Sequence, residues 1–100
     1  MARLVALALM LAAQPAIARS WTEEKCDIYG QAWGEAVRTR GTADLSPAFL
    51  AAHDAFLASS CRERAVCPRS AAEVAMADLM TIMAVNARIA GTFLPFICRP

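Results

Sequence analysis

The sequence has few of the residues from which catalytic and metal centres are built. Among its 100 residues there are one histidine and four cysteines, and the cysteines form no Cys-x-x-Cys motif. Thioredoxin-type redox chemistry and covalent haem attachment both depend on that motif, so neither is expected. A tetrahedral zinc site needs three or four well-placed ligands, which one histidine and widely spaced cysteines do not supply. We therefore expect no cofactor and no catalytic residue.

The single histidine, His53, does not improve the case for an enzyme. Asp54 follows it, and Ser59 and Ser60 lie nearby, which are the residue types of a hydrolase triad. Adjacent helical residues point about 100° apart, however, so Asp54 cannot readily orient His53. The strand-turn-helix setting of a nucleophilic serine is also missing. We predict that His53 is a partly exposed helical residue and that the protein is not an enzyme.

The sequence also lacks an excess of charge of either sign. Ten basic residues are balanced by nine acidic ones. Loss of Arg3 with a predicted signal peptide would leave a formal charge of zero, without the basic patch that binds nucleic acids or anionic lipids. Nucleic acid is therefore a poor candidate partner. All the basic residues except Lys25 are arginine and alanine is abundant, which is typical of GC-rich bacterial genomes.

Residues 1–18 have the layout of a secretory signal peptide. Arg3 precedes an apolar run over residues 4–13, and a small-x-small sequence follows as Ala-Ile-Ala. That run, at about 1.5 Å per helical residue, spans only half of the roughly 30 Å hydrocarbon core, which argues against a membrane anchor. We expect cleavage before Arg19 and export to the periplasm, with extracellular release as the alternative. Residues 19–100 would then be a single helical domain without stable membrane insertion.

A domain of this size depends on its cysteines for stability. Chains of about 80 residues bury only about 60 to 65 per cent of their unfolded surface, and each disulfide contributes roughly 2–4 kcal/mol. The four cysteines allow three pairings. We favour Cys61 with Cys67, because this pair is local, and Cys26 with Cys98. The alternatives are Cys26–Cys61 with Cys67–Cys98, and Cys26–Cys67 with Cys61–Cys98.

Three helices fit the mature sequence. Ser20, or alternatively Thr22, is the expected N-cap of the first helix, and Gly41 is a natural C-terminal stop. Two glycines inside this helix, Gly30 and Gly34, either admit a close neighbouring helix or lie on the surface. Its apolar residues recur every three or four positions. They are Cys26, Tyr29, Trp33, Ala36 and Val37.

The second helix begins after Ser46, with Pro47 at its first position, where the missing N–H has no helical partner. Its apolar stripe consists of Phe49, Ala52, Phe56 and Leu57. Short loops make the first two helices antiparallel, which places Cys26 and Cys61 at the same end of the bundle. We expect Cys67 to start the third helix from that end as well.

The third helix has a capping box formed by Ser70 and Glu73. From Val74 to Ile89 it is apolar nearly all round. A helix of this kind is usually enclosed by the rest of the domain, so we expect it to be the central, most buried element. Asp78 would then pair with an arginine or a backbone donor.

The C-terminal segment is too apolar to extend into water. Pro95 disfavours a continuous helix, and the surrounding residues are Phe93, Leu94, Phe96 and Ile97. The predicted fold is therefore all-α: a small disulfide-linked bundle of three helices with an apolar C-terminal tail packed back on it.

Three methionines on the third helix allow a different hypothesis. Met76, Met80 and Met83 lie at spacings of four and three, along one helical face. Thioethers prefer Cu(I), so a periplasmic copper-binding protein is the alternative function. Methionine is also an ordinary core residue, and the neighbouring Leu79 and Ile82 favour that interpretation. A copper site would require an exposed methionine face.

Small exported helical domains without enzyme motifs are usually binding proteins. A Cys-x2-Tyr-Gly sequence at residues 26–30, the pair Cys67-Pro68 and an aromatic-rich segment ending in Cys98 resemble small disulfide-linked helical proteins of bacterial periplasms. Acid-stress chaperones and toxin-immunity proteins are examples, and the resemblance implies general architecture alone. We expect this protein to bind another periplasmic or envelope protein, as an accessory, inhibitor or chaperone-like factor.

Aromatic side chains that a small core cannot wholly bury are the predicted contact surface for that partner. They are Trp21, Trp33, Phe93 and Phe96. A small molecule held between the helices is a third hypothesis.

Overall fold

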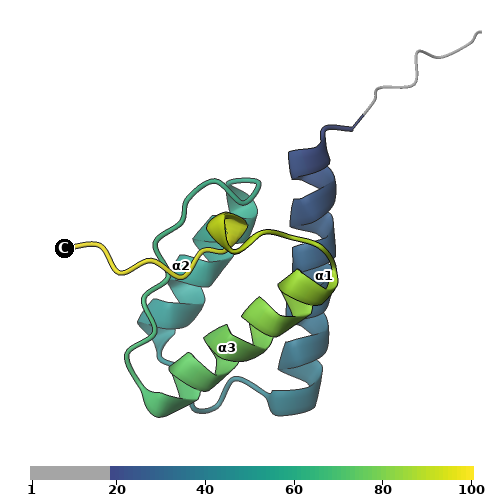
Figure 1. The fold of residues 1–100 in the computed structure, drawn as a ribbon. Coiled ribbons are helices and arrows are strands. Elements are labelled where there is room, and N and C mark those ends of the chain that lie inside the picture. The colour runs from purple at the N-terminus through teal and green to yellow at the C-terminus, as the bar shows by residue number, and fades with distance from the viewer. Residues whose placement is uncertain (1–18) are drawn as a thin grey trace, which may run out of the picture.

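A computed structural model describes residues 19–100, which form three α-helices and one 3-10 turn and no strand (Figure 1). The elements are α1 (Trp21–Arg40), α2 (Pro47–Ala58), α3 (Ala71–Asn86) and η1 (Gly91–Phe93). The predicted all-α class and the three-helix bundle are confirmed. The predicted signal peptide, residues 1–18, lies outside the described residues, so its cleavage stays a prediction.

The helix ends carry the caps that the sequence predicts. The Ser20 hydroxyl accepts a hydrogen bond from the backbone N–H of Glu23 at 3.2 Å, and Ser46 accepts one from Phe49 at 3.1 Å. After α1 the chain turns at Gly41, whose φ of 72° lies in the left-handed region. Glycine adopts that conformation without steric strain, so its position ends the helix at low cost.

Glu73 connects the start of α3 to the start of α2. Its backbone N–H donates to the Ser70 hydroxyl at 3.1 Å, which confirms the predicted capping box. Its carboxylate accepts backbone N–H bonds from Ser46 at 2.8 Å, Arg69 at 3.0 Å and Ser70 at 3.4 Å. These donors favour the ionised form and lower the pKa of Glu73 to about 2. The two helix N-termini therefore lie at the same end of the bundle.

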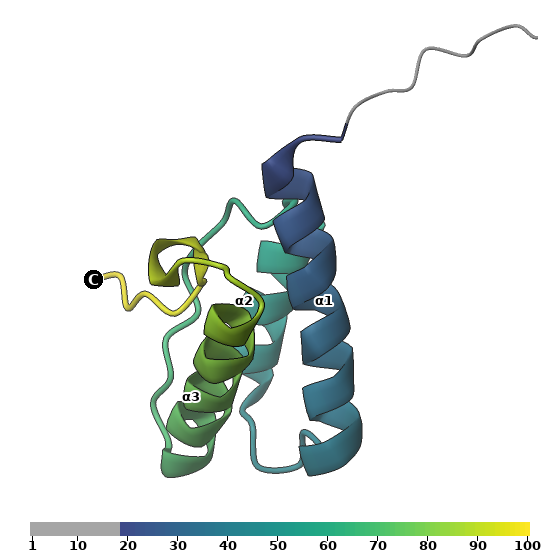
Figure 2. The same cartoon turned by 45° about the vertical axis from the view of Figure 1, so that its right-hand side comes forward.

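The route between α2 and α3 differs from the expected tight corner. As predicted, α1 and α2 are antiparallel, which brings Cys26 and Cys61 together (Figures 1 and 2). Residues 62–69 then run back along the bundle without helical structure, and α3 begins at the opposite end (Figure 1). The prediction that Cys67 starts α3 at the Cys26 end is wrong, because eight residues without helical structure carry the chain much further than a turn does.

The disulfide pairing follows from that route. Cys26 is bonded to Cys61, with the Cα atoms 5.6 Å apart, and Cys67 is bonded to Cys98, with the Cα atoms 4.5 Å apart. The favoured pairing of Cys61 with Cys67 and Cys26 with Cys98 is wrong, and the first alternative holds. Six residues of extended chain can separate their ends by about 20 Å, so Cys67 is not a local neighbour of Cys61.

The C-terminal tail packs back on the bundle, as predicted, and it does so beside residues 62–69. The backbone N–H of Val66 donates to the carbonyl of Pro95 at 2.9 Å. The Arg64 side chain donates to the carbonyl of Leu94 at 2.8 Å. Leu94 and Pro95 are buried, so this segment closes one side of the core and the second disulfide holds it there.

Burial of α3 is limited to one side. Met76 and Met80 face the core, with exposed fractions of 3% and 0%. Val74, Ile82 and Val85 lie on the opposite side and are 46%, 59% and 57% exposed. Among the described helices α3 nevertheless has the most buried residues, five against three in α2 and two in α1, so the prediction that it is the most buried helix is confirmed. The expectation that the rest of the domain encloses it on all sides is wrong, because the residues described cover one side of it.

Asp78 lies on the exposed side of α3. Within residues 19–100 it has no ion-pair partner and no side-chain hydrogen bond, since the one ion pair there joins Arg19 to Asp27. The expected arginine or backbone donor for Asp78 is therefore wrong. The expectation depended on full burial of α3, and an exposed carboxylate needs no protein partner because water solvates it.

Candidate functional site

His53 lies at the centre of the core instead of at its edge. Its exposed fraction is 0%, so the prediction of a partly exposed residue is wrong. Phe49, His53 and Phe56 are spaced by four and three residues and all point inward from α2. That helical spacing was visible in the sequence and could have identified His53 as a core residue.

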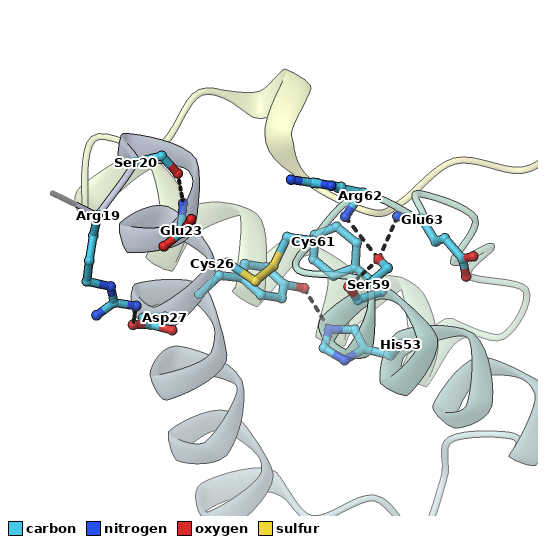
Figure 3. The surroundings of a disulfide bond; sticks show 12 residues. Arg19, Ser20, Glu23, Cys26, Asp27, His53, Ser59, Cys61, Arg62 and Glu63 are labelled. Carbon is cyan, nitrogen blue, oxygen red and sulfur yellow. Dashed lines mark hydrogen bonds and ion pairs between the residues drawn. A yellow bond between two sulfur atoms is a disulfide. The ribbon is translucent and has the colours of Figure 1, made fainter. Parts of the chain in front are cut away.

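Aromatic side chains from three elements surround the imidazole. The Tyr29 hydroxyl lies 2.7 Å from His53 Nε2, and Figure 3 marks the hydrogen bond at the His53 ring. The Trp33 ring stacks on the imidazole with centroids 3.8 Å apart. Phe56 packs edge-on at 6.2 Å, and Phe96 from the tail lies at 6.4 Å. The imidazole thus lies in an aromatic enclosure without a carboxylate.

This surrounding keeps His53 uncharged near neutral pH. Burial lowers the pKa of His53 to about 4, because the apolar core does not solvate an imidazolium. Burial also raises the pKa of Tyr29, so its hydroxyl stays protonated. His53 Nδ1 is buried and has no hydrogen-bond partner among the residues described. The Tyr29–His53 pair is a neutral hydrogen bond that packs the core.

The other residues of a hydrolase triad lie apart from His53. Asp54 is exposed on the outer side of α2. The Ser59 hydroxyl accepts backbone N–H bonds from Arg62 at 3.0 Å and Glu63 at 2.8 Å (Figure 3). Ser59 therefore stabilises the turn after α2, and its hydroxyl is occupied by backbone partners.

The methionines of α3 mostly belong to the core. Met76 and Met80 are buried, and Met83 is half-buried against the same cluster. The copper alternative would require these three thioethers on the surface. Within residues 19–100, no group of three or more His, Cys, Asp or Glu side chains could hold a metal ion.

The predicted partner surface is only partly exposed. Trp21 is 56% exposed. Trp33, Phe93 and Phe96 are half-buried and pack against the core, and the Lys25 ammonium lies 5.0 Å from the Phe93 ring centroid. The predicted partner surface did not include the exposed apolar residues of α3, which are Val74, Ile82 and Val85. Their exposure was missed because a helix that is apolar nearly all round was expected to be buried on every side.

The hollows on the surface are small or open. One at the α1–α2 turn has a volume of about 240 Å³ and is lined by Leu45 and Met76 among others, below the roughly 300 Å³ of typical ligand sites. A broader one of about 610 Å³ opens to solvent along α1 beside Gly30 and Gly34. Both glycines are half-buried. A Cβ at Gly30 would contact Leu57 of α2 at 3.8 Å, an ordinary van der Waals distance, and one at Gly34 would contact Arg38 of its own helix at 3.6 Å, so neither glycine is required for a close helix approach.

Among the described helices, none combines the length and the apolar character needed to cross a membrane. Comparison with known proteins found no matching family model, no matching curated protein and no matching solved structure.

Proposed function

We propose that the protein is a small exported domain that binds another protein in the periplasm, without catalytic activity of its own. The observation that carries the proposal is the exposed apolar side of α3, where Val74, Ile82 and Val85 are about half exposed. Exposed apolar side chains gathered on one helix face are candidates for an interaction site, because covering them with a partner removes apolar surface from water.

The covalent framework supports the proposed compartment. All four cysteines are paired in two disulfides, and such bonds persist in oxidising compartments such as the periplasm. The buried His53 and the capping Ser59 support a binding role over an enzymatic one, because each has a structural partner that explains it. An accessory, inhibitor or chaperone-like factor fits these features.

The test is affinity capture from the native periplasm with the exported protein immobilised under non-reducing conditions. We expect one protein to be retained in a fixed ratio, to be displaced by excess free protein, and to re-form the complex when both components are purified. If no protein is displaced by the free chain anywhere between pH 5 and pH 8, the proposed function is wrong.

A further inference from the structure

The exposed residues of α3 form one continuous stripe. At 100° per residue, the outward positions lie within an arc of about 100°, opposite the buried methionines. We call the central part of this stripe the α3 outer face; it consists of Val74, Ala75, Asp78, Ile82 and Val85, while the exposed Ala71 and Asn86 are the first and last residues of the helix. An exposed helix face usually carries several charged residues, whereas this face carries one.

Asp78 is the one charged residue within the α3 outer face, and the nearest basic neighbour known from the lining of a hollow is Arg40, which borders Ala75 at the edge of the face. Asp78 lies in the middle of the α3 outer face, exposed and without an ion-pair partner within residues 19–100. Neither α2 nor α3 contains a lysine or arginine. A complementary surface would therefore be apolar with one positive charge at its centre.

We propose that the α3 outer face binds a helix of another protein that carries one arginine or lysine flanked by apolar side chains. The cation pairs with Asp78, and the apolar side chains cover Val74, Ile82 and Val85. This inference rests on the proposed function and names the chemistry of the partner. A helix fits because outward residues spaced by four, four and three form ridges that interdigitate with those of a second helix.

A second copy of this chain complements the α3 outer face poorly. Antiparallel pairing of two α3 helices that sets Val74 against Val85 would remove both Asp78 carboxylates from water without supplying a cation. Burying an unpaired charge is strongly unfavourable. The stripe spans residues 74–85 and is about 18 Å long and about 10 Å wide, roughly 180 Å², so pairing of two α3 helices alone would bury far less than the roughly 800 Å² per partner of stable interfaces.

A lipid surface also complements the α3 outer face poorly. Helices that lie in membrane interfaces are rich in lysine and arginine on their polar side. The α3 helix has none, and Asp78 would be repelled by anionic headgroups.

The limited area of the α3 outer face means that a single partner helix binds weakly, with a dissociation constant on the order of 10–100 μM.

The test uses the exported full-length product and a synthetic helical peptide of about 18 residues, capped at both ends, with leucines on one side and an arginine at the centre of that side. Binding is measured by calorimetry and by shifts of the backbone amide NMR signals. We expect the shifts to map to residues 74–85. A peptide with glutamate in place of arginine should bind about tenfold more weakly, because it sets two negative charges together.

Protein variants assign the effect to single side chains. Asp78→Asn should reduce the preference for the arginine peptide to less than threefold, and Ile82→Glu should abolish binding of both peptides. Both residues are exposed, so the fold should survive, and thermal unfolding checks this. Ala51→Glu, on the exposed side of α2, is the matched control and should leave binding unchanged.

Four results would overturn the proposal: no amide shifts at millimolar arginine peptide, equal binding of both peptides, a dimer in ultracentrifugation that Ile82→Glu dissociates, or α3-dependent binding to phosphatidylglycerol vesicles. The proposed function is tested separately. Capture of the same periplasmic protein by Ile82→Glu and by the unmodified chain would retain the proposed function and refute the α3 outer face. Peptide binding without any native partner would refute the proposed function instead.

Discussion

His53 is a base enclosed by aromatic rings, and protonating it would place a charge in the core. The unfolded chain binds a proton near pH 6.5, whereas the folded protein does so only near its lowered pKa of about 4. The stabilisation is therefore complete above pH 6.5 and is lost as the pH falls towards 4. The shift corresponds to about 3 kcal/mol in total, at about 1.4 kcal/mol for each pH unit.

Urea unfolding should show this loss. We expect the free energy of unfolding to fall by about 2 kcal/mol between pH 7 and pH 5, a range above the ordinary pKa of Glu73. The variant His53→Phe keeps an aromatic ring beside Trp33 but has no titratable group, so its unfolding free energy should stay nearly constant over the same range. Equal pH dependence in both proteins would mean that His53 is not the titrating group.

At the scale of elements, Glu73 holds two helix starts together. Its low pKa of about 2 arises from backbone N–H bonds, foremost that of Ser46. The stabilisation by its charge is present above the ordinary carboxyl pKa of 4.5 and is lost as the pH falls from 4.5 to 2. We expect Glu73→Gln to lower the melting temperature by several degrees at pH 7. Circular dichroism should show the difference narrowing below pH 4.5.

The exposed Glu35 of α1 provides the matched control. Glu35→Gln removes the same charge without removing a bond between helices, so the melting temperature should change by less than one or two degrees. A Glu73→Gln protein as stable as Glu35→Gln would show that the Ser46 bond contributes little.

The tail disulfide should open before the helix disulfide. Cys98 is exposed and Cys67 half-buried, whereas Cys61 is only 4% exposed. A thiolate reductant must reach a sulfur atom, so low dithiothreitol should reduce Cys67–Cys98 first. Alkylation followed by peptide mapping measures the order. Initial labelling of Cys26 and Cys61 would contradict it.

Loss of the tail disulfide should be measurable as a loss of stability. We expect the double variant Cys67→Ser/Cys98→Ser to lose roughly 2–4 kcal/mol of unfolding free energy, because its unfolded chain is no longer restrained by this disulfide. The tail would then detach, and the Val66 amide should lose its hydrogen-exchange protection at Pro95. Unchanged protection would show that packing alone holds the tail.

At the scale of the whole molecule, the sequence predicts an exported product that starts at Arg19 and has no free thiol. Intact mass spectrometry of the protein purified without reductant tests both statements. Alkylation of the denatured protein should add no mass before reduction and four alkyl groups after it. A product that retains residues 1–18, or one with free thiols, would contradict the proposed export or the two disulfides.

Local features could be predicted because neighbouring residues determine them. Ser46 with Pro47, and Ser70 with Glu73, mark helix starts through bonds that reach only three residues along the chain. The position of His53 could have been predicted from its spacing to Phe49 and Phe56, had histidine been counted as a core residue. The hydrogen bond from the Ser46 backbone N–H to the Glu73 carboxylate could not be predicted from the sequence, because it joins residues 27 positions apart.

By itself, the sequence determined the three helices, their caps, the apolar tail and the need for disulfides in so small a domain, since these depend on local pattern and composition. Only the tertiary structure decided the cysteine pairing and which side of α3 is covered. The physical reason for the pairing is the route of residues 62–69 along the bundle, which carries Cys67 away from Cys61 and places it beside Cys98 of the returning tail, 31 positions further along the chain. Among the described residues, the same packing leaves one largely apolar side of α3 without a neighbour, and in the middle of the helix only Asp78 distinguishes that side from the buried one.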